Sequence, residues 1–299
     1  MSSNTANSSA PRAGALTIDV EDYYHVHALA NVIDRADWDT LPSHVEANTN
    51  RLLDLFAAKE ATATFFTLGS VGQRFPQLLH RIVAEGHELA SHGWAHYAVH
   101  QQTRAEFHED VRRARETLED IGAAPVRGYR APSFSIDTTT PWAYEVLAET
   151  GHSYSSSSHP IAHDHYGDAD APRHPFVEPS AGIVEIPITT LQFGKRRYPG
   201  AGGGFFRAFP LAHSRMVLRR MAKEGVAPNF NLHHWEIDPD QPRYKEAPLK
   251  SRMRHYIGLS RCERKLSRLL DGMAWTRMDR AYKDWLEPAA ADENSSAAA

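Results

Sequence analysis

The chain has almost no cysteine. Its one thiol, Cys262 in the stretch SRCERKL, is alone among 299 residues, so no internal disulfide framework can form. Chains without disulfides are typical of compartments that keep thiols reduced. The sequence therefore predicts a cytoplasmic protein, and its 41% of hydrophobic residues is sufficient for an ordinary globular core.

Long hydrophobic runs are also missing. No window approaches the roughly 18 consecutive apolar residues of a membrane span. The N-terminal stretch MSSNTANSSAPRAG lacks the apolar segment of a secretory signal. We expect no membrane span, and at most a peripheral association with the inner face of a membrane.

The sequence has no overall excess of positive charge. Its formal net charge is -4, whereas a nucleic-acid partner would require a basic stripe. Lys and Arg do gather locally, at residues 195–197 and between Arg252 and Arg268. These clusters are compatible with a modest anionic ligand, and we expect no binding of nucleic acid.

Internal repeats and long linkers are absent, so the sequence predicts a single domain. Residues 1–13 and 287–299 are rich in Ser, Ala and Asn and are predicted to be disordered tails. Between them, short apolar stretches alternate with helical patterns, which indicates parallel β/α units. Enough units are present to close an irregular barrel, in which chemistry is expected where strands end and loops begin.

The apolar patterns give the expected elements. Strands are predicted over residues 14–20, 61–68, 87–91, 126–132, 152–157, 182–189 and 229–234. Helices are predicted from a capping box at Ser43 and Glu46 to about 59, over 76–85, from a second box at Thr103 and Glu106 to about 121, and over 141–150 and 211–224. The Gly-rich stretch 199–206 is predicted to be a flexible loop near the cleft.

Histidine is abundant, with 18 residues, so spacing alone is weak evidence for a metal site. About one His-x-x-x-His pair is expected by chance, and three occur: 92/96, 96/100 and 159/163. A metal site therefore needs further support from the rest of the chain.

That support comes from the predicted strand ends. Four stretches, TIDVED, SHGWAH, YRAPS and NLHHWE, place polar side chains there: Asp19, Glu21, Asp22, His92, His96, Arg130, His233 and His234. Two histidines and a carboxylate fit an open zinc site. A second carboxylate can act as general base and a histidine as general acid, while Arg130 can hold a carboxylate ionised.

Each of these residues also has a simpler interpretation. A strand-end Asp is often a helix cap or turn residue, Arg130 can be a surface salt bridge, and His233 can be a core histidine. Together, at successive strand ends of one barrel, they favour a metal-assisted hydrolase.

The four motifs, in this order and at these separations, resemble the polysaccharide deacetylase family, also called the NodB homology domain or carbohydrate esterase family 4. The resemblance covers about residues 14–280. The stretches 189–207 and 233–243 are similar to the branch of the family that is associated with exosortase and exopolysaccharide gene clusters.

The resemblance implies a distorted (β/α)7 barrel over residues 14–240, followed by a C-terminal extension over 241–286 that packs on the barrel. It implies removal of N-acetyl groups from amino sugars, by hydrolysis of a linear amide, with one divalent metal ion, usually zinc. By position, Asp19 is the general base, His92 and His96 are metal ligands, His233 is the general acid and Arg130 braces Asp19.

The sequence departs from the common family pattern in two places. The family has adjacent Asp residues where DVED separates them here, which leaves Glu21 and Asp22 as rival ligands, and we favour Asp22. Ser133 stands where the family has a tyrosine whose backbone N–H stabilises the oxyanion, and a backbone donor survives that change.

Neighbouring residues complete the expected site. Of the adjacent His233 and His234, only one can point into the site, because neighbouring strand residues face opposite ways. Aromatic residues near the motifs are candidates for stacking on sugar rings or for ordinary core packing: Trp94, Trp235, Tyr129 and Phe134.

Two other functions remain open from the sequence. A deformylase or other amidohydrolase would keep the metal and act on a small or lipid-linked amide. A catalytically inactive sugar-binding protein would keep the scaffold without the reaction.

Overall fold

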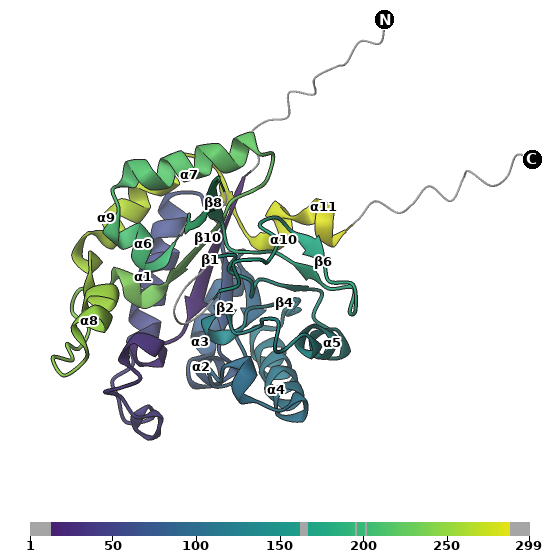
Figure 1. Ribbon diagram of the computed structural model, residues 1–299. Helices are drawn as coiled ribbons and strands as arrows, with labels where there is room; N and C mark the ends of the chain where they lie inside the picture. Colours follow the sequence, from purple (N-terminus) through teal and green to yellow (C-terminus); the bar gives the residue numbers. More distant parts are fainter. Residues whose placement is uncertain (1–12, 162–166, 195, 201, 288–299) are drawn as a thin grey trace, which may run out of the picture.

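The computed structural model describes residues 13–161, 167–194, 196–200 and 202–287 (Figure 1). Of the two tails predicted from the sequence, residues 1–12 and 288–299 lie outside the described residues. Within the described ranges, no helix combines the length and the apolar character that crossing a membrane requires.

One curved sheet forms the centre of the molecule. Its strands lie in the order β10 (Asn229–His233), β1 (Gly14–Val20), β2 (Thr64–Thr67), β3 (Glu88–Ser91), β4 (Gly128–Tyr129), β5 (Tyr154–Ser155), β7 (Val184–Glu185) and β6 (Phe176–Val177). Neighbouring strands are parallel except β6 and β7, and β11 (Trp275–Thr276) pairs with the start of β1. The first strand therefore lies beside a strand from the last third of the chain.

Helices connect the strands of the first half. They are α1 (Val45–Ala58), α2 (Gly69–Arg74), α3 (Pro76–Ala84), α4 (Arg104–Gly122) and α5 (Trp142–Glu149). Parallel neighbours need such crossovers, and in Figure 1 these helices lie around the sheet. The predicted class is confirmed: the chain forms a mixed α/β half-barrel.

The second half adds a hairpin and several helices. These are β8 (Thr190–Phe193) with β9 (Arg196–Pro199), α6 (Gly203–Ala208), α7 (Leu211–Lys223), α8 (Leu249–Tyr256), α9 (Leu259–Leu270), α10 (Met278–Ala281) and α11 (Lys283–Leu286). The interpretation of residues 199–206 as a flexible loop was wrong in part, because α6 begins at Gly203. The stretch does lie at the cleft, as expected.

Side chains close the side of the barrel that strand pairing leaves open. Asn229 at the start of β10 donates its backbone N–H to Thr189 Oγ1 at 2.8 Å. Its side-chain amide donates to Ser156 Oγ at 3.0 Å and to the Ile186 carbonyl at 3.3 Å. One buried asparagine thus joins β10 to the segments that follow β5 and β7.

The largest apolar cluster packs α1, α3 and α9 against the sheet. Its larger members include Leu16, Phe56, Phe65, Ile82, Phe206, Phe230, Leu266, Leu269 and Trp275. Both halves of the sequence contribute to this core, so the chain packs as one unit.

The two predicted capping boxes differ in outcome. At α4, Thr103 accepts from the Glu106 backbone and Glu106 accepts from the Thr103 backbone, as predicted. At α1 the N-cap is His44 without a side-chain cap, and the Ser43 hydroxyl donates to Asp22 instead. Asp22 diverts Ser43, so the box predicted at Ser43 and Glu46 does not form.

Candidate active site

The first and last parallel strands bring the candidate residues together. β1 and β10 run side by side with Asp19 opposite His233 in the register. The carboxyl ends of parallel strands meet at one rim of a sheet. Residues more than two hundred positions apart therefore face one cavity.

Asp19 is held by two buried donors. Arg130 Nη1 donates to Asp19 Oδ1 at 2.6 Å, and Asn231 Nδ2 donates to Asp19 Oδ2 at 2.8 Å. Arg130 is fully buried and also donates to Thr17 and to Ser156. This geometry places Arg130 where it can brace and orient the Asp19 carboxylate.

Asn231 was not identified from the sequence. It lies two residues before His233 on β10, so the two side chains leave the strand on the same face. This alternation of side chains along the stretch NFNLH was the sequence signal that could have identified Asn231.

Three side chains form a compact candidate metal centre. Glu21, His92 and His96 each present one ligand atom, and these atoms lie within 4.8 Å of one another. Glu21 Oε2 lies 2.6 Å from His96 Nε2 and 3.3 Å from His92 Nε2. Although burial opposes ionisation, His96 and His92 hold the pKa of Glu21 well below its ordinary value.

The donors of this group suit a divalent cation. His92 Nδ1 lies 2.7 Å from the Arg130 carbonyl, which can only accept, so Nδ1 carries the proton and Nε2 offers a lone pair. Glu21 Oε2 is buried and forms no hydrogen bond with the described residues. One carboxylate and two imidazoles match an open zinc site.

The structure favours Glu21 over Asp22, the acid preferred from the sequence, as the carboxylate ligand. The Asp22 carboxylate accepts hydrogen bonds from the Tyr24 hydroxyl at 3.0 Å, the Ser43 hydroxyl at 2.5 Å and the His44 backbone at 2.9 Å. Through these contacts Asp22 holds the segment that precedes α1 in place. Its rival Glu21 takes the position beside the histidines.

The loop SHGWAH has a shape that ordinary residues rarely adopt. Gly93 has φ +77° and His96 has φ +60°, so the chain turns back between the two imidazoles. Asp110 on α4 accepts from the Trp94 backbone at 2.8 Å and fixes this turn. His92 and His96 thus meet across a loop rather than along a helix.

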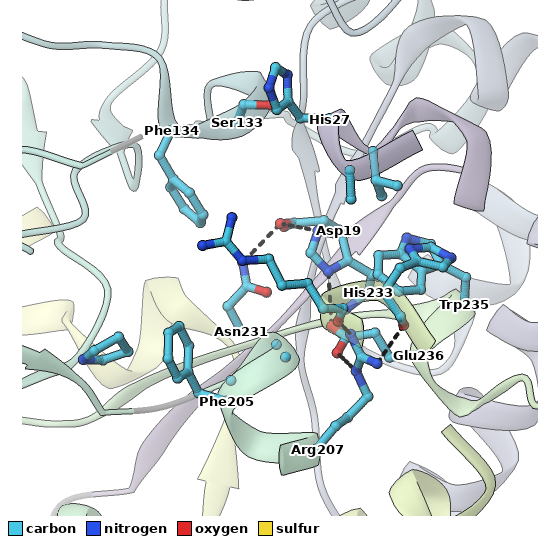
Figure 2. Close-up of a pocket in the computed structure, with 18 of the residues that line it drawn as sticks. Asp19, His27, Ser133, Phe134, Phe205, Arg207, Asn231, His233, Trp235 and Glu236 are labelled. Atoms are coloured by element: carbon cyan, nitrogen blue, oxygen red, sulfur yellow. Dashed lines mark hydrogen bonds and ion pairs between the residues drawn. The ribbon is translucent and has the colours of Figure 1, made fainter. Parts of the chain in front are cut away.

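His233 is oriented by a buried chain of charges. Its Nδ1 lies 2.9 Å from Glu236 Oε1, and Glu236 Oε2 accepts from Arg207 Nε at 2.5 Å. Figure 2 shows this chain running from Arg207 through Glu236 to His233. Glu236 and Arg207 were not identified from the sequence.

The charges of Arg207, Glu236 and His233 stabilise one another. Burial disfavours the Glu236 carboxylate, but Arg207 and His233 lower the pKa of Glu236 to about 2. Burial also disfavours the His233 imidazolium, but Glu236, Glu21 and Asp19 raise the pKa of His233 to about 9. With Nδ1 directed at Glu236, the other nitrogen of His233 can present a proton to the cavity.

His234 is separate from this arrangement. It is fully buried and does not line the cavity, and burial lowers its pKa to about 3. His233, by contrast, lies 3.7 Å from Asp19 Oδ2 and 3.5 Å from Glu21 Oε1 through Nε2.

The site opens into a cavity of about 590 Å³. Figure 2 shows Phe134 and Phe205 on one side of it and His233 with Trp235 on the other. Trp235 lies behind His233, with the rings stacked 4.9 Å apart. Ser133 lines the cavity and, like Phe134, has a positive φ, which is strain of a kind that clusters at functional sites.

The assignment of Trp94 to the substrate was wrong. Trp94 does not line the cavity, and its ring stacks against Arg113 at 3.5 Å while packing close to Gly69. It serves to join the SHGWAH loop to α2 and α4. Tyr129 is likewise a core residue.

Comparison with known families agrees with this geometry. Residues 36–155 match the model of the family described as polysaccharide deacetylase. This part of the chain is therefore similar to polysaccharide deacetylases of the NodB type. Residues 156–283 match a second model, described as a domain of unknown function, DUF3473. The two matches meet directly after β5, so both contribute strands to the one sheet.

Curated relatives match the deacetylase part of the chain. A Bacillus subtilis protein provisionally named a polysaccharide deacetylase, YheN, is 30% identical over 131 residues, which cover 44% of this chain and 46% of that protein. The chitooligosaccharide deacetylase of Bradyrhizobium sp. is 35% identical over 101 residues, which cover 33% of this chain and 43% of the relative. The chain thus spans less than half the length of these relatives.

A solved structure is similar in fold to almost the whole of this chain. It is the crystal structure of a Mycobacterium smegmatis protein, also provisionally named a polysaccharide deacetylase, with a TM-score of 0.58 and 20% identity. The likeness covers 90% of this chain and 89% of that one. It supports the fold assignment.

Proposed function

We propose that this chain is a metal-dependent deacetylase that removes N-acetyl groups from an amino sugar in a polysaccharide or in its lipid-linked precursor. The observation that carries the proposal is that Asp19 and His233 line the same cavity as the Glu21, His92 and His96 group, with His233 Nε2 3.7 Å from Asp19 Oδ2 and 3.5 Å from Glu21 Oε1. The deacetylase family match and the relatives that act on saccharides support the same reaction class.

The donor set favours zinc. Glu21, His92 and His96 would hold the ion, which when bound polarises the amide carbonyl and makes water more acidic. Asp19 would accept the proton of the attacking water, because Arg130 and Asn231 keep its carboxylate in place. His233 would donate its Nε2 proton to the departing amine, so that acetate and a free amino sugar leave.

The backbone N–H of Ser133 is our candidate for stabilising the oxyanion. Ser133 lines the cavity in a turn with φ +54°, the kind of fixed local geometry on which such donors depend. A single donor of this type contributes roughly 3–4 kcal/mol to the transition state. We also assign a substrate contact to Trp235, which lines the cavity beside His233 and stacks on its ring.

The setting of the reaction follows from the sequence. The single cysteine supports a cytoplasmic location, and the resemblance of residues 189–207 and 233–243 supports exopolysaccharide biosynthesis as the process. We assign the metal as zinc and the substrate as an N-acetylated saccharide.

The variant Asp19→Asn tests the roles directly. It should bind metal like the unmodified chain, because Asp19 is not a ligand, and lower kcat roughly a thousandfold through loss of the base. Metal content by mass spectrometry and acetate release from an N-acetylated oligosaccharide measure the two effects. Asp54→Asn, at an exposed carboxylate on α1, is the matched control and should leave both unchanged.

Two results would reject the proposal. If the metal-loaded chain binds the oligosaccharide without releasing acetate, the inactive sugar-binding function is favoured. If an N-formylated substrate is hydrolysed and the N-acetylated one is not, the deformylase alternative replaces the deacetylase.

A further inference from the structure

An exposed apolar ridge runs along α8 next to the cavity. Leu249 and Met253 are spaced by four residues and therefore lie on one side of the helix, and Ile257 follows directly at its C-cap. Their exposed fractions are 69%, 59% and 38%, and Phe209 beside them is 45% exposed. A row of large apolar side chains left in water marks a binding surface.

This ridge continues into the active-site cavity. Met253, Ile257 and Phe209 line the same hollow as Asp19 and His233. The exposed fraction falls from Leu249 to Ile257, so the apolar surface leads from the tip of α8 toward the cavity. Whatever covers the ridge also borders the cavity.

Positive charge surrounds the ridge. Residues 243–268 contain nine Lys and Arg but only two Glu. A second hollow of about 340 Å³ is lined by Arg261, Arg264, Lys265 and Arg268, and it shares Phe209 with the cavity. Among the described residues no carboxylate pairs with these three arginines, and Glu263 is paired with Arg51 on α1.

We propose that this face, which we call the α8 face (Leu249, Met253, Ile257, Phe209, Arg261, Arg264 and Arg268), docks on an anionic lipid bilayer. Apolar side chains on a surface helix enter the boundary between headgroups and acyl chains, and nearby Lys and Arg attract anionic lipids. Figure 1 shows α6, α8 and α9 gathered on the same side of the molecule.

The charge pattern favours a bilayer over a second copy of the chain. Two copies that met through this face would bring two groups of unpaired arginines together, which is unfavourable. A surface of anionic phosphates would neutralise them instead. The cavity would then open beside the membrane, and, if the proposed function is correct, its substrate class would be a lipid-linked amino sugar.

Vesicle binding tests the docking separately from catalysis. The full chain should sediment with vesicles of phosphatidylcholine and phosphatidylglycerol, and much less with phosphatidylcholine alone or at high salt. Leu249→Asp should weaken binding about tenfold, because an apolar contact is lost and a negative charge is added. Arg261→Glu with Arg264→Glu should weaken it at least as much.

Trp285→Asp is the matched control. Trp285 lies on α11, away from α8 in Figure 1, and is 41% exposed, so its replacement should leave vesicle binding unchanged. Leu249 does not line the cavity, so Leu249→Asp should hydrolyse a water-soluble oligosaccharide at the unmodified rate. Thermal unfolding of each variant checks that the fold is intact.

Three outcomes would overturn the docking proposal. They are vesicle binding that does not depend on anionic lipid, unchanged binding by folded Leu249→Asp, and loss of turnover on the soluble oligosaccharide by that variant. The last outcome would indicate that the ridge binds the sugar chain of the substrate. Vesicle binding requires no catalysis, so failure of the proposed reaction would leave this test intact.

Discussion

The acids at the end of the first strand have different surroundings. Asp19 on β1 and Glu21 just past its end both line the cavity, while Asp22 does not line it and accepts from Ser43. The role of Glu21, which lies beside the imidazoles, can therefore be distinguished from that of Asp22, which supports the loop.

Replacing each acid by its amide makes this difference measurable. Glu21→Gln should lower zinc affinity by at least about tenfold, because a neutral amide oxygen replaces the carboxylate ligand. Asp22→Asn should retain zinc and lose about 1 kcal/mol of stability through its weakened contacts with Ser43 and His44. Competition with a zinc chelator and urea unfolding give the two quantities.

The opposite pattern would contradict the assignment. If Asp22→Asn releases zinc while Glu21→Gln holds it, Asp22 is the ligand and the described arrangement of the DVED stretch changes when metal binds.

Residues at strand ends could be predicted from the sequence, and their buried partners could not. Asp19, His92, His96 and His233 follow predictable strands, and the structure brings all four to one cavity. Arg207 reaches Glu236 from 29 positions away, in a Gly-rich stretch with no helical pattern. No local periodicity encodes such a contact, so it required the three-dimensional structure.

At the scale of elements, a glycine sets how closely α6 approaches β10. Gly202 forms a bridge to Asn231, and a Cβ atom at Gly202 would overlap the Asn231 carbonyl. Its φ of +105° is also a conformation that other residues rarely adopt. The approach positions Arg207 and Phe205 at the cavity.

Gly202→Ala should therefore destabilise the protein by more than about 2 kcal/mol. Gly203→Ala is the matched control, because no atom lies within 4 Å of its Cβ position, and its φ of +54° should cost only about 1 kcal/mol. Chemical denaturation compares the two. Equal losses of stability in the two variants would show that backbone strain, rather than overlap with Asn231, limits substitution at Gly202.

A buried acid joins several elements at the other end of the strands. Glu88 on β3 accepts from Thr64 on β2 at 2.6 Å and from Tyr154 on β5 at 2.9 Å. The Asp279 backbone on α10 also donates to it at 3.3 Å. Burial and the charge of Asp279 raise the pKa of Glu88 from 4.5 to about 7.

This shift predicts a stability that falls with pH. The folded protein holds the Glu88 proton more tightly than the unfolded chain, so the contribution is complete below pH 4.5 and is lost as the pH rises through about 7. The complete loss should be on the order of 3 kcal/mol. Glu88→Gln mimics the neutral acid and should remove this part of the dependence of the unfolding free energy on pH.

Urea unfolding of both proteins at about pH 4 and about pH 8 measures the effect, because these values lie on either side of the interval from 4.5 to about 7. An equal pH dependence in Glu88→Gln and the unmodified chain would exclude Glu88 as its source.

The elements themselves could be predicted where local signals are strong. Thr103 and Glu106 form the predicted box, and Pro76 begins α3 as expected. The strands β4, β5 and β7 have only two residues each, although longer strands were predicted there. Sheet curvature and pairing, which are long-range, shorten them.

At the scale of the molecule, residues after 240 complete the central core. α9 and β11 contribute Cys262, Leu266, Leu269, Leu270 and Trp275 to the cluster that packs on the sheet. The predicted barrel of residues 14–240 thus shares its interior with the predicted extension of residues 241–286.

A chain that ends after residue 240 should fail to fold. It would lose about 10 kcal/mol of apolar burial, which is comparable with the whole stability of a domain. Circular dichroism and thermal melting, compared with the full chain, should show no cooperative transition. A cooperative melt near that of the full chain would show that the extension is dispensable.

The half-barrel could be predicted as a class, but its closure could not. Alternating strand and helix patterns indicate parallel β/α units, whereas the open side is spanned by hydrogen bonds of Asn229 to Thr189, Ser156 and Ile186. A single residue that reaches three distant partners through its backbone and its side chain leaves no periodic trace in a sequence.

The pairing of β1 with β10 also constrains when the protein can become active. Asp19 leaves the ribosome early, and Asn231, its hydrogen-bond partner, is synthesised 212 residues later. At ordinary translation rates this delay is about 10–40 s. Throughout that interval the Asp19 carboxylate lacks one of the two donors that hold it, and His233 is also still to be made, so a growing polypeptide has no working site and any hydrolysis begins only after synthesis is almost complete.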